Sequence, residues 1–164
     1  MKKLFLSIAL SANMAHAAIP VATCGQMSGY SYVPNLTDNQ QDSLLSRKFL
    51  NGKQLPDNWV SDGFSNGSIN VVQLTKDKFD ILIYNQPRNE TFSTIKDGGR
   101  VIFIRGSNEE IVFMIMYPET VTVYTIVKTK QGSKVSVIES KNGMMIRTSM
   151  FSGSCTFVDW AKFK

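Results

Sequence analysis

Turn signals recur about every ten residues from residue 63 onward, and this spacing constrains the fold more than any other feature. They include the pairs Asn66-Gly67, Lys76-Asp77, Asp97-Gly98, Ser107-Asn108, Pro118-Glu119, Gln131-Gly132 and Asn142-Gly143. Between them lie short stretches rich in β-branched and aromatic residues, such as FDILIYN and, near the C-terminus, MMIRTSM and CTFVDW. This alternation is typical of antiparallel strands joined by tight links. We therefore predict a mainly β fold, an antiparallel up-and-down meander of about eight or nine strands that forms a barrel or a two-layer sandwich.

One segment before the meander has the pattern of a helix. In LTDNQQDSLLSRKFLNG, residues 36–52, Thr37 and Gln40 form a capping-box pattern, and Leu45 and Phe49 lie four residues apart. The following Asn-Gly pair supplies a stop signal. We predict one short N-terminal helix that lies against the sheet or plugs one end of a barrel.

The first 17 residues, MKKLFLSIALSANMAHA, have the features of a bacterial signal peptide. Two lysines precede an apolar run, and the small-x-small pattern of Ala15-His16-Ala17 follows it. The apolar run is shorter than the roughly 20 residues that a membrane helix needs. We expect a signal peptide at 1–17, a single β-rich domain at 18–164, a periplasmic or secreted location, and no membrane span in the mature protein.

The two cysteines, Cys24 and Cys155, lie near opposite ends of the predicted mature chain. In an oxidising compartment they are expected to pair as a structural disulfide. A reactive thiol pair is disfavoured because the Cys-x-x-Cys spacing is absent.

The charges of the mature chain are dispersed. After removal of the signal peptide, sixteen lysines and arginines face thirteen acidic residues, a formal net charge of +3. The lysines stand beside turns or alternate along strands and lack the clustering of a nucleic-acid surface, so no nucleic-acid partner is expected.

Histidine is missing from the predicted mature chain, because the only one is His16. This argues against Ser-His catalysis and against the usual zinc sites, so we predict no catalytic residue, no metal and no cofactor. GFSNG, residues 63–67, matches a nucleophile-elbow pattern, but a strand follows it where a helix is required, so Ser65 is interpreted as a turn residue. Only paired carboxylates could act without these groups, as in glycoside hydrolases.

The most apolar stretch is IVFMIMYPETVTVYTIV, residues 111–127, which we interpret as two strands joined at Pro118. The first strand is apolar on both faces, so both must be covered. In the second, the face with Thr122 and Tyr124 is predicted to be the wet one. The side chains that could line a ligand cavity or a partner surface are Phe113, Met114, Ile115, Met116 and Tyr124; for Met114 and Met116 the alternative is packing under the helix.

Three aromatic residues lie near the start of the domain. Tyr30 and Tyr32 share one face of an extended segment, and Trp59 stands at the entry to the meander. They are candidates for a ligand or partner platform, or they close the bottom of the core.

The chain resembles a group of small secreted bacterial β-rich proteins. The resemblance lies in CGQMSGYSYVP, DGF, FDILIYN, KDGGRVIFIRG and a strand that ends in Tyr117-Pro118. It implies secretion and a β-rich domain, and it supplies no catalytic residue. By architecture the meander is also similar to lipocalin-like barrels.

Three functions are compatible with these features. The favoured hypothesis is a non-catalytic periplasmic or secreted protein that binds a small apolar molecule. The first alternative is a protein-interaction module, such as an inhibitor or immunity-type protein, and the second is a carboxylate-dependent glycoside hydrolase. A ligand cavity predicts apolar side chains with space around them inside the sheet. An interaction module predicts a filled core and an exposed apolar patch.

Overall fold

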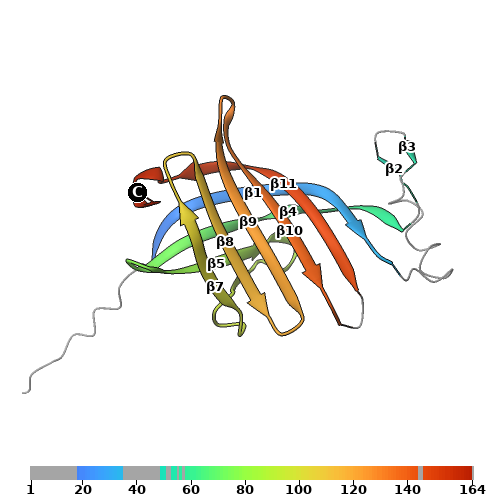
Figure 1. Cartoon of the computed structure of the whole chain (residues 1–164), viewed down its shortest axis with the longest axis horizontal. Coiled ribbons are helices and arrows are strands. Elements are labelled where there is room, and N and C mark those ends of the chain that lie inside the picture. Colours follow the sequence, from blue (N-terminus) through green and yellow to red (C-terminus); the bar gives the residue numbers. More distant parts are fainter. Residues whose placement is uncertain are drawn as a thin grey trace, which may run out of the picture.

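The computed structural model describes residues 18–34, 49–50, 53–54, 56, 58–143 and 146–163. Nine strands form one antiparallel sheet, in the order β6-β5-β4-β1-β11-β10-β9-β8-β7. Their bounds are β1 (Ile19–Tyr32), β4 (Trp59–Thr75), β5 (Lys78–Asn85), β6 (Glu90–Ser93), β7 (Arg100–Gly106), β8 (Glu110–Tyr117), β9 (Thr120–Thr129), β10 (Gly132–Lys141) and β11 (Arg147–Val158). The sheet curls into a half-barrel (Figure 1). The prediction of a mainly β, antiparallel fold is confirmed.

The half-barrel is a meander that returns to its own first strand. β4, β5 and β6 follow one another on one side of β1, while β7 to β11 follow one another on the other side, and β11 pairs with β1. β6 and β7 are the two edges of the sheet. In Figure 1, β7 to β10 run steeply in front and β1, β4 and β5 cross behind them. The inner faces of these two walls enclose the core.

Bulges and small residues allow the long first strand to follow this curve. The register of the 14-residue β1 shifts against β11 between Thr23 and Cys24 and again between Gly25 and Ser28. A bulge bends a strand and increases its twist. At Gly29 the strand approaches β11 so closely that a Cβ atom would collide with the carbonyl oxygen of Met150.

Some of the predicted strand boundaries are wrong. The expected turn at Asn66-Gly67 lies inside β4, which continues because it pairs with β1 along most of its length and also with β5 from Gly67 onward. The predicted strands at 144–150 and 155–160 are replaced by one strand, β11, because β1 and β10 bond its middle from both sides. β1 itself is not among the predicted strands, since its glycines and serines hide the alternation.

The predicted N-terminal helix is not confirmed. Residues 35–48 lie outside the described part of the chain, and Phe49–Leu50 form a two-residue strand, β2, that pairs with β3 (Lys53–Gln54). The described ranges contain no α-helix, only the short 3-10 helices η2 (Gln86–Arg88) and η3 (Trp160–Phe163). The predicted signal peptide also lies outside these ranges, and within them no helix is long and apolar enough to cross a membrane.

One end of the half-barrel is filled by aromatic rings. Phe163 of η3 is buried and stacks on Phe79 of β5 at a centroid distance of 5.8 Å. Phe113 of β8 meets the same ring edge-on at 5.2 Å, and Phe103 of β7 contacts all three. These rings join β5 to β7 across the open side of the sheet. This end of the half-barrel is therefore filled by the C-terminal segment.

Cys24 and Cys155 form a disulfide between β1 and β11, as predicted. The bond spans 131 residues of sequence and joins the first strand of the sheet to the last. It therefore ties together the two strands that complete the half-barrel.

Candidate functional site

The residues predicted to bind a ligand or partner separate into three places. Phe113 is completely buried in the aromatic end of the core. Tyr124 faces inward from β9, where it is paired with Phe113 of β8, and it lines a pocket that extends from there toward the turn between β8 and β9. The other five share the outer face of the sheet: Tyr30, Tyr32, Trp59, Met114 and Met116. Ile115, also considered, is buried and faces inward.

The strand register aligns these five residues in two neighbouring rows. Successive side chains of a strand alternate between faces, and side chains paired across strands share a face. The first row crosses six strands and consists of Ile102, Met114, Val123, Ile138, Met150 and Tyr30. In the next row the large apolar residues are Met116, Val121, Tyr32 and Trp59. We call these ten residues the outer apolar band.

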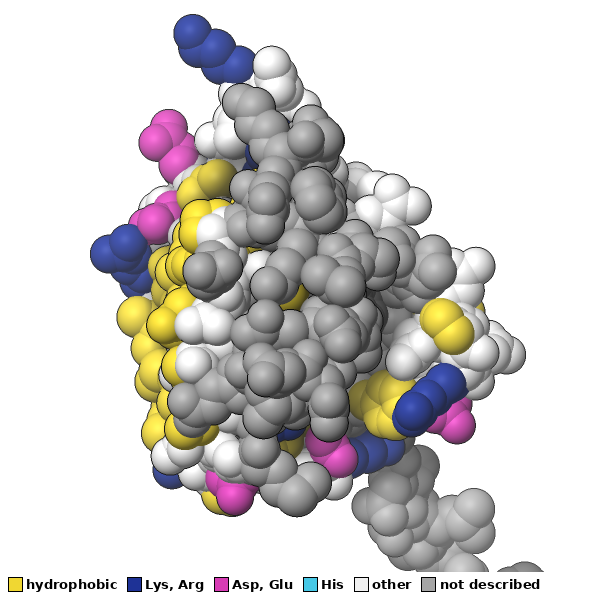
Figure 2. Space-filling model, turned by 90° about the vertical axis from the view of Figure 1, so that its right-hand side faces the viewer, with side chains coloured by type: hydrophobic (Ala, Val, Ile, Leu, Met, Phe, Trp, Pro, Cys, Tyr) yellow, Lys and Arg dark blue, Asp and Glu magenta, His cyan; other side chains and the backbone are white. Residues whose placement is uncertain are grey.

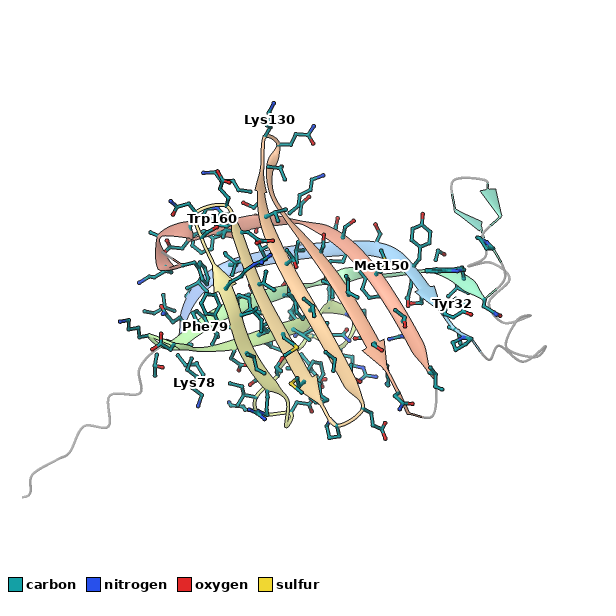
Figure 3. All side chains as sticks on the ribbon, in the orientation of Figure 1. Tyr32, Lys78, Phe79, Lys130, Met150 and Trp160 are labelled. Carbon is teal, nitrogen blue, oxygen red and sulfur yellow. A yellow bond between two sulfur atoms is a disulfide. The ribbon has the colours of Figure 1, made fainter. Side chains whose placement is uncertain are left out.

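The outer apolar band is exposed although it is made of core-type side chains. Ile138 and Met150 are each 52% exposed, and Val121 and Met116 are also exposed. Tyr32 and Trp59 pack on each other at a centroid distance of 5.4 Å. Figure 3 labels Tyr32 and Met150 toward one end of the molecule and Phe79 and Trp160 toward the other. Figure 2 looks at the former end and shows hydrophobic side chains along one edge of the profile, with charged side chains above and below them.

Basic residues border the outer apolar band. Arg100 is aligned with Met116 at one margin of the band. Lys134 is aligned with Val127 and lies outside the opposite margin of the band. Arg105 is paired with Glu110 at 2.8 Å. On the outward faces of β1 and β7 to β11, within the ranges that the structure describes, the charges are therefore three cations and one carboxylate. These faces therefore carry a net charge of +2, and the exposed Glu119 lies in the turn beside Met116 and Val121.

The open end of the half-barrel contains a pocket of about 640 Å³, which we call the mouth pocket. It lies opposite the aromatic end, beside the turn between β8 and β9. Its lining combines apolar, hydroxyl and charged side chains: Ile83, Thr94, Asp97, Ile115, Tyr117, Pro118, Glu119, Thr120, Thr122, Tyr124, Glu139, Lys141 and Arg147.

The face of β9 that was predicted to be wet points into the half-barrel. Thr122 is 4% exposed and Tyr124 is 6% exposed, whereas Val121 on the opposite face is exposed. The expectation from alternation was therefore reversed. The register gives the reason: Tyr124 is paired with the buried Phe113 and Val137, and Thr122 with Glu139, so the hydroxyl-bearing face is on the inside and the valine face joins the outer apolar band.

A polar network crosses the inner wall next to the mouth pocket. Arg147 of β11 binds Glu139 of β10 at 2.8 Å and lies 3.6 Å from Asp62 of β4. Ser31 donates a hydrogen bond to Asp62 at 2.6 Å, and the hydroxyls of Ser31 and Ser149 are 2.7 Å apart. Four strands are thus joined by charged and hydroxyl groups.

Sequence reasoning missed this network because its members come from four separate strands. The available signal was weak: Glu139, Arg147 and Ser149 interrupt otherwise apolar inward positions. Strand pairing, which the sequence does not state, brings them together.

Burial raises the pKa of Tyr124 well above its ordinary value, and the charge of Glu139 adds to the shift. The pKa of Tyr117 is also raised, first by burial and then by the nearby carboxylate of Asp97, which accepts a hydrogen bond from the Tyr117 hydroxyl at 3.3 Å. Both side chains are therefore neutral phenols at physiological pH, and the Tyr124 hydroxyl is left to donate a hydrogen bond into the mouth pocket.

The raised pKa of Tyr124 predicts a loss of stability at high pH. Above about pH 10 the hydroxyl ionises in the unfolded chain while it stays neutral in the folded one, so its contribution is complete below pH 10 and is lost as pH rises. Tyr124→Phe should flatten this fall by up to about 1.4 kcal/mol per pH unit. Urea unfolding at about pH 9 and about pH 11.5 measures the slopes. Equal slopes for the two proteins would contradict the assignment.

The described residues contain no group of three or more histidine, cysteine, aspartate or glutamate side chains placed to hold a metal ion. Comparison of the chain with protein-family models, curated proteins and solved structures gives no match. The functional argument therefore depends on the outer apolar band and the mouth pocket.

Proposed function

We propose that the protein is a periplasmic or secreted interaction module that binds a partner protein through the outer apolar band. The observation that carries the proposal is the alignment of ten large apolar side chains on an outward sheet face. Monomeric proteins rarely expose contiguous apolar patches of this kind without a binding role. Aromatic and methionine side chains are also enriched in protein interfaces.

Charge favours an acidic partner over a second copy of the chain. Two copies packed face to face would bring the basic margins around Arg100 and Lys134 toward each other, and like charges across an interface cost free energy. A partner with apolar side chains between carboxylates would match both the band and its margins. The basic surface would also steer such a partner toward the band.

A filled aromatic end and a polar mouth pocket lead us to rank a partner protein above a small apolar ligand. Phe113 has no free surface, and Met114 and Met116 lie on the outer face. A carboxylate-dependent hydrolase is ranked lower, since the inward carboxylates of Asp62 and Glu139 both lie beside Arg147.

A photo-crosslinking residue at position 138, in the full chain expressed in its host, identifies the partner. The matched control is the same residue at position 157, because Phe157 is 46% exposed but lies outside the outer apolar band. We expect one acidic protein to crosslink from position 138 and not from 157. Equal crosslinking from both sites, or from neither, would contradict the proposal.

Binding of the purified partner then tests the individual side chains. Ile138→Lys and Met150→Lys should each weaken the affinity by about tenfold or more, because each removes a large apolar contact from the centre of the interface. Phe157→Lys should leave the affinity unchanged, and Arg100→Glu combined with Lys134→Glu should slow association. Calorimetry and surface plasmon resonance measure these effects. A wild-type dimer in sedimentation analysis that Met150→Lys dissociates would instead identify a second copy as the occupant.

A further inference from the structure

The mouth pocket is lined by two hydroxyls that have no hydrogen-bond partner among the described residues. They belong to Thr122 and Tyr124 of β9, whose side chains are more than nine-tenths buried while their hydroxyls reach the pocket. Hydroxyls in such a setting are normally satisfied by protein, water or ligand. These two groups therefore present unused hydrogen-bonding capacity to whatever enters the pocket.

The charges of the pocket lining are nearly balanced. Three carboxylates, those of Asp97, Glu119 and Glu139, face the two cations Lys141 and Arg147. Glu139 and Arg147 already neutralise each other at 2.8 Å. A strongly charged ligand would leave part of this mixed lining unmatched. A neutral ligand that carries both donors and acceptors would match it.

Donors and acceptors lie close to an apolar surface in the same pocket. The neutral phenol of Tyr124 can donate, the carboxylates of Asp97 and Glu119 can accept, and Ile115 provides an apolar surface. A sugar ring has this combination, since its hydroxyls both donate and accept while its C–H face is apolar. The pocket volume also falls within the range of roughly 300 to 1,000 Å³ that is typical of small-molecule sites.

We propose that the mouth pocket binds a neutral polyhydroxylated molecule, a monosaccharide or disaccharide, with hydrogen bonds from the hydroxyls of Tyr124 and Thr122. This inference concerns the inner end of the half-barrel and does not depend on the outer apolar band. Tyr124 orients the ring by donating to a ring or hydroxyl oxygen, and the rim carboxylates accept from neighbouring hydroxyls.

Titration of the isotopically labelled mature protein, residues 18–164, tests the proposal by NMR. The probes are glucose, galactose, N-acetylglucosamine and lactose, compared with 1,6-diaminohexane as a cationic probe and decanoate as an apolar one. We expect at least one sugar to shift the amide signals of β9 and of the turn at Pro118-Glu119 with a saturable dependence on concentration. Shifts there with the diamine or decanoate alone would overturn the proposal, as would no shift with any sugar.

Two variants test the roles of the hydroxyls. Tyr124→Phe and Thr122→Val remove one hydroxyl each at nearly constant volume, and each should weaken binding of the responding sugar by about tenfold. Tyr84→Phe is the matched control. Tyr84 of β5 does not line the mouth pocket, and its hydroxyl donates a hydrogen bond to Asn89 at an exposed site. Unchanged affinity in both pocket variants would overturn the assignment. Ile138→Lys should leave sugar binding intact, so a failure of this proposal is distinguishable from a failure of the proposed function.

Discussion

Replacing both Cys24 and Cys155 with alanine is expected to lower the free energy of unfolding by up to about 5 kcal/mol. The disulfide closes a loop of 131 residues, and such a crosslink removes many conformations from the unfolded chain. A loss of this size is comparable to the total stability of many small domains. Urea unfolding of the oxidised wild type and of the double variant, both without reductant, measures the difference.

Wild-type protein unfolded in the presence of reductant provides the control. It should unfold at the same urea concentration as the double variant, because both lack the crosslink and the alanines remove little else. A difference of less than about 1 kcal/mol between the crosslinked and uncrosslinked proteins would show that the unfolded chain retains the contact of β1 with β11. If neither uncrosslinked protein folds, the free energy of unfolding of the oxidised wild type is a lower limit on the contribution of the disulfide.

The disulfide and the aromatic end stabilise different parts of the same curled sheet. The disulfide ties β1 to β11. The Phe163 ring lies between β5 and β7, the strands on either side of the open part of the sheet. The half-barrel is thus held by a covalent bond on its paired side and by ring packing on its open side. The mouth pocket lies at the end that neither feature fills.

The fold class could be predicted from the sequence because it depends on local signals. β-branched runs and turn pairs predicted antiparallel strands, and the disulfide was predicted from two cysteines in a chain that the sequence suggests is exported. What could not be predicted depends on pairing. Alternation along β9 divides its side chains into two faces, but it does not say which is inside. The strand register decides it: Thr122 is paired with Glu139 of β10, and Tyr124 is paired with the buried Val137 and Phe113, so this face is inside.

The sequence supplies candidate site residues one by one but does not group them into a surface. Met114, Tyr30 and Trp59 were each chosen for their chemistry, and only the register between distant strands brings them to one outer face. Phe113 was also predicted from its chemistry, but it lies in the aromatic end of the core. Successive side chains of β8 point alternately to the inner and the outer face of the sheet. A single apolar stretch therefore contributes to both the aromatic end and the outer apolar band.

Phe113→Ala is therefore expected to destabilise the fold by about 3 to 5 kcal/mol. The Phe113 side chain is completely buried and touches the rings of Phe79, Phe103 and Phe163, so its removal leaves a cavity at the aromatic end. Phe92→Ala is the control, because Phe92 is exposed on the edge strand β6, and it should change stability by less than about 0.5 kcal/mol. Thermal and urea unfolding measure both. A loss below about 1 kcal/mol for Phe113→Ala would mean that the ring lines open space, as a ligand-binding role requires, rather than a packed core.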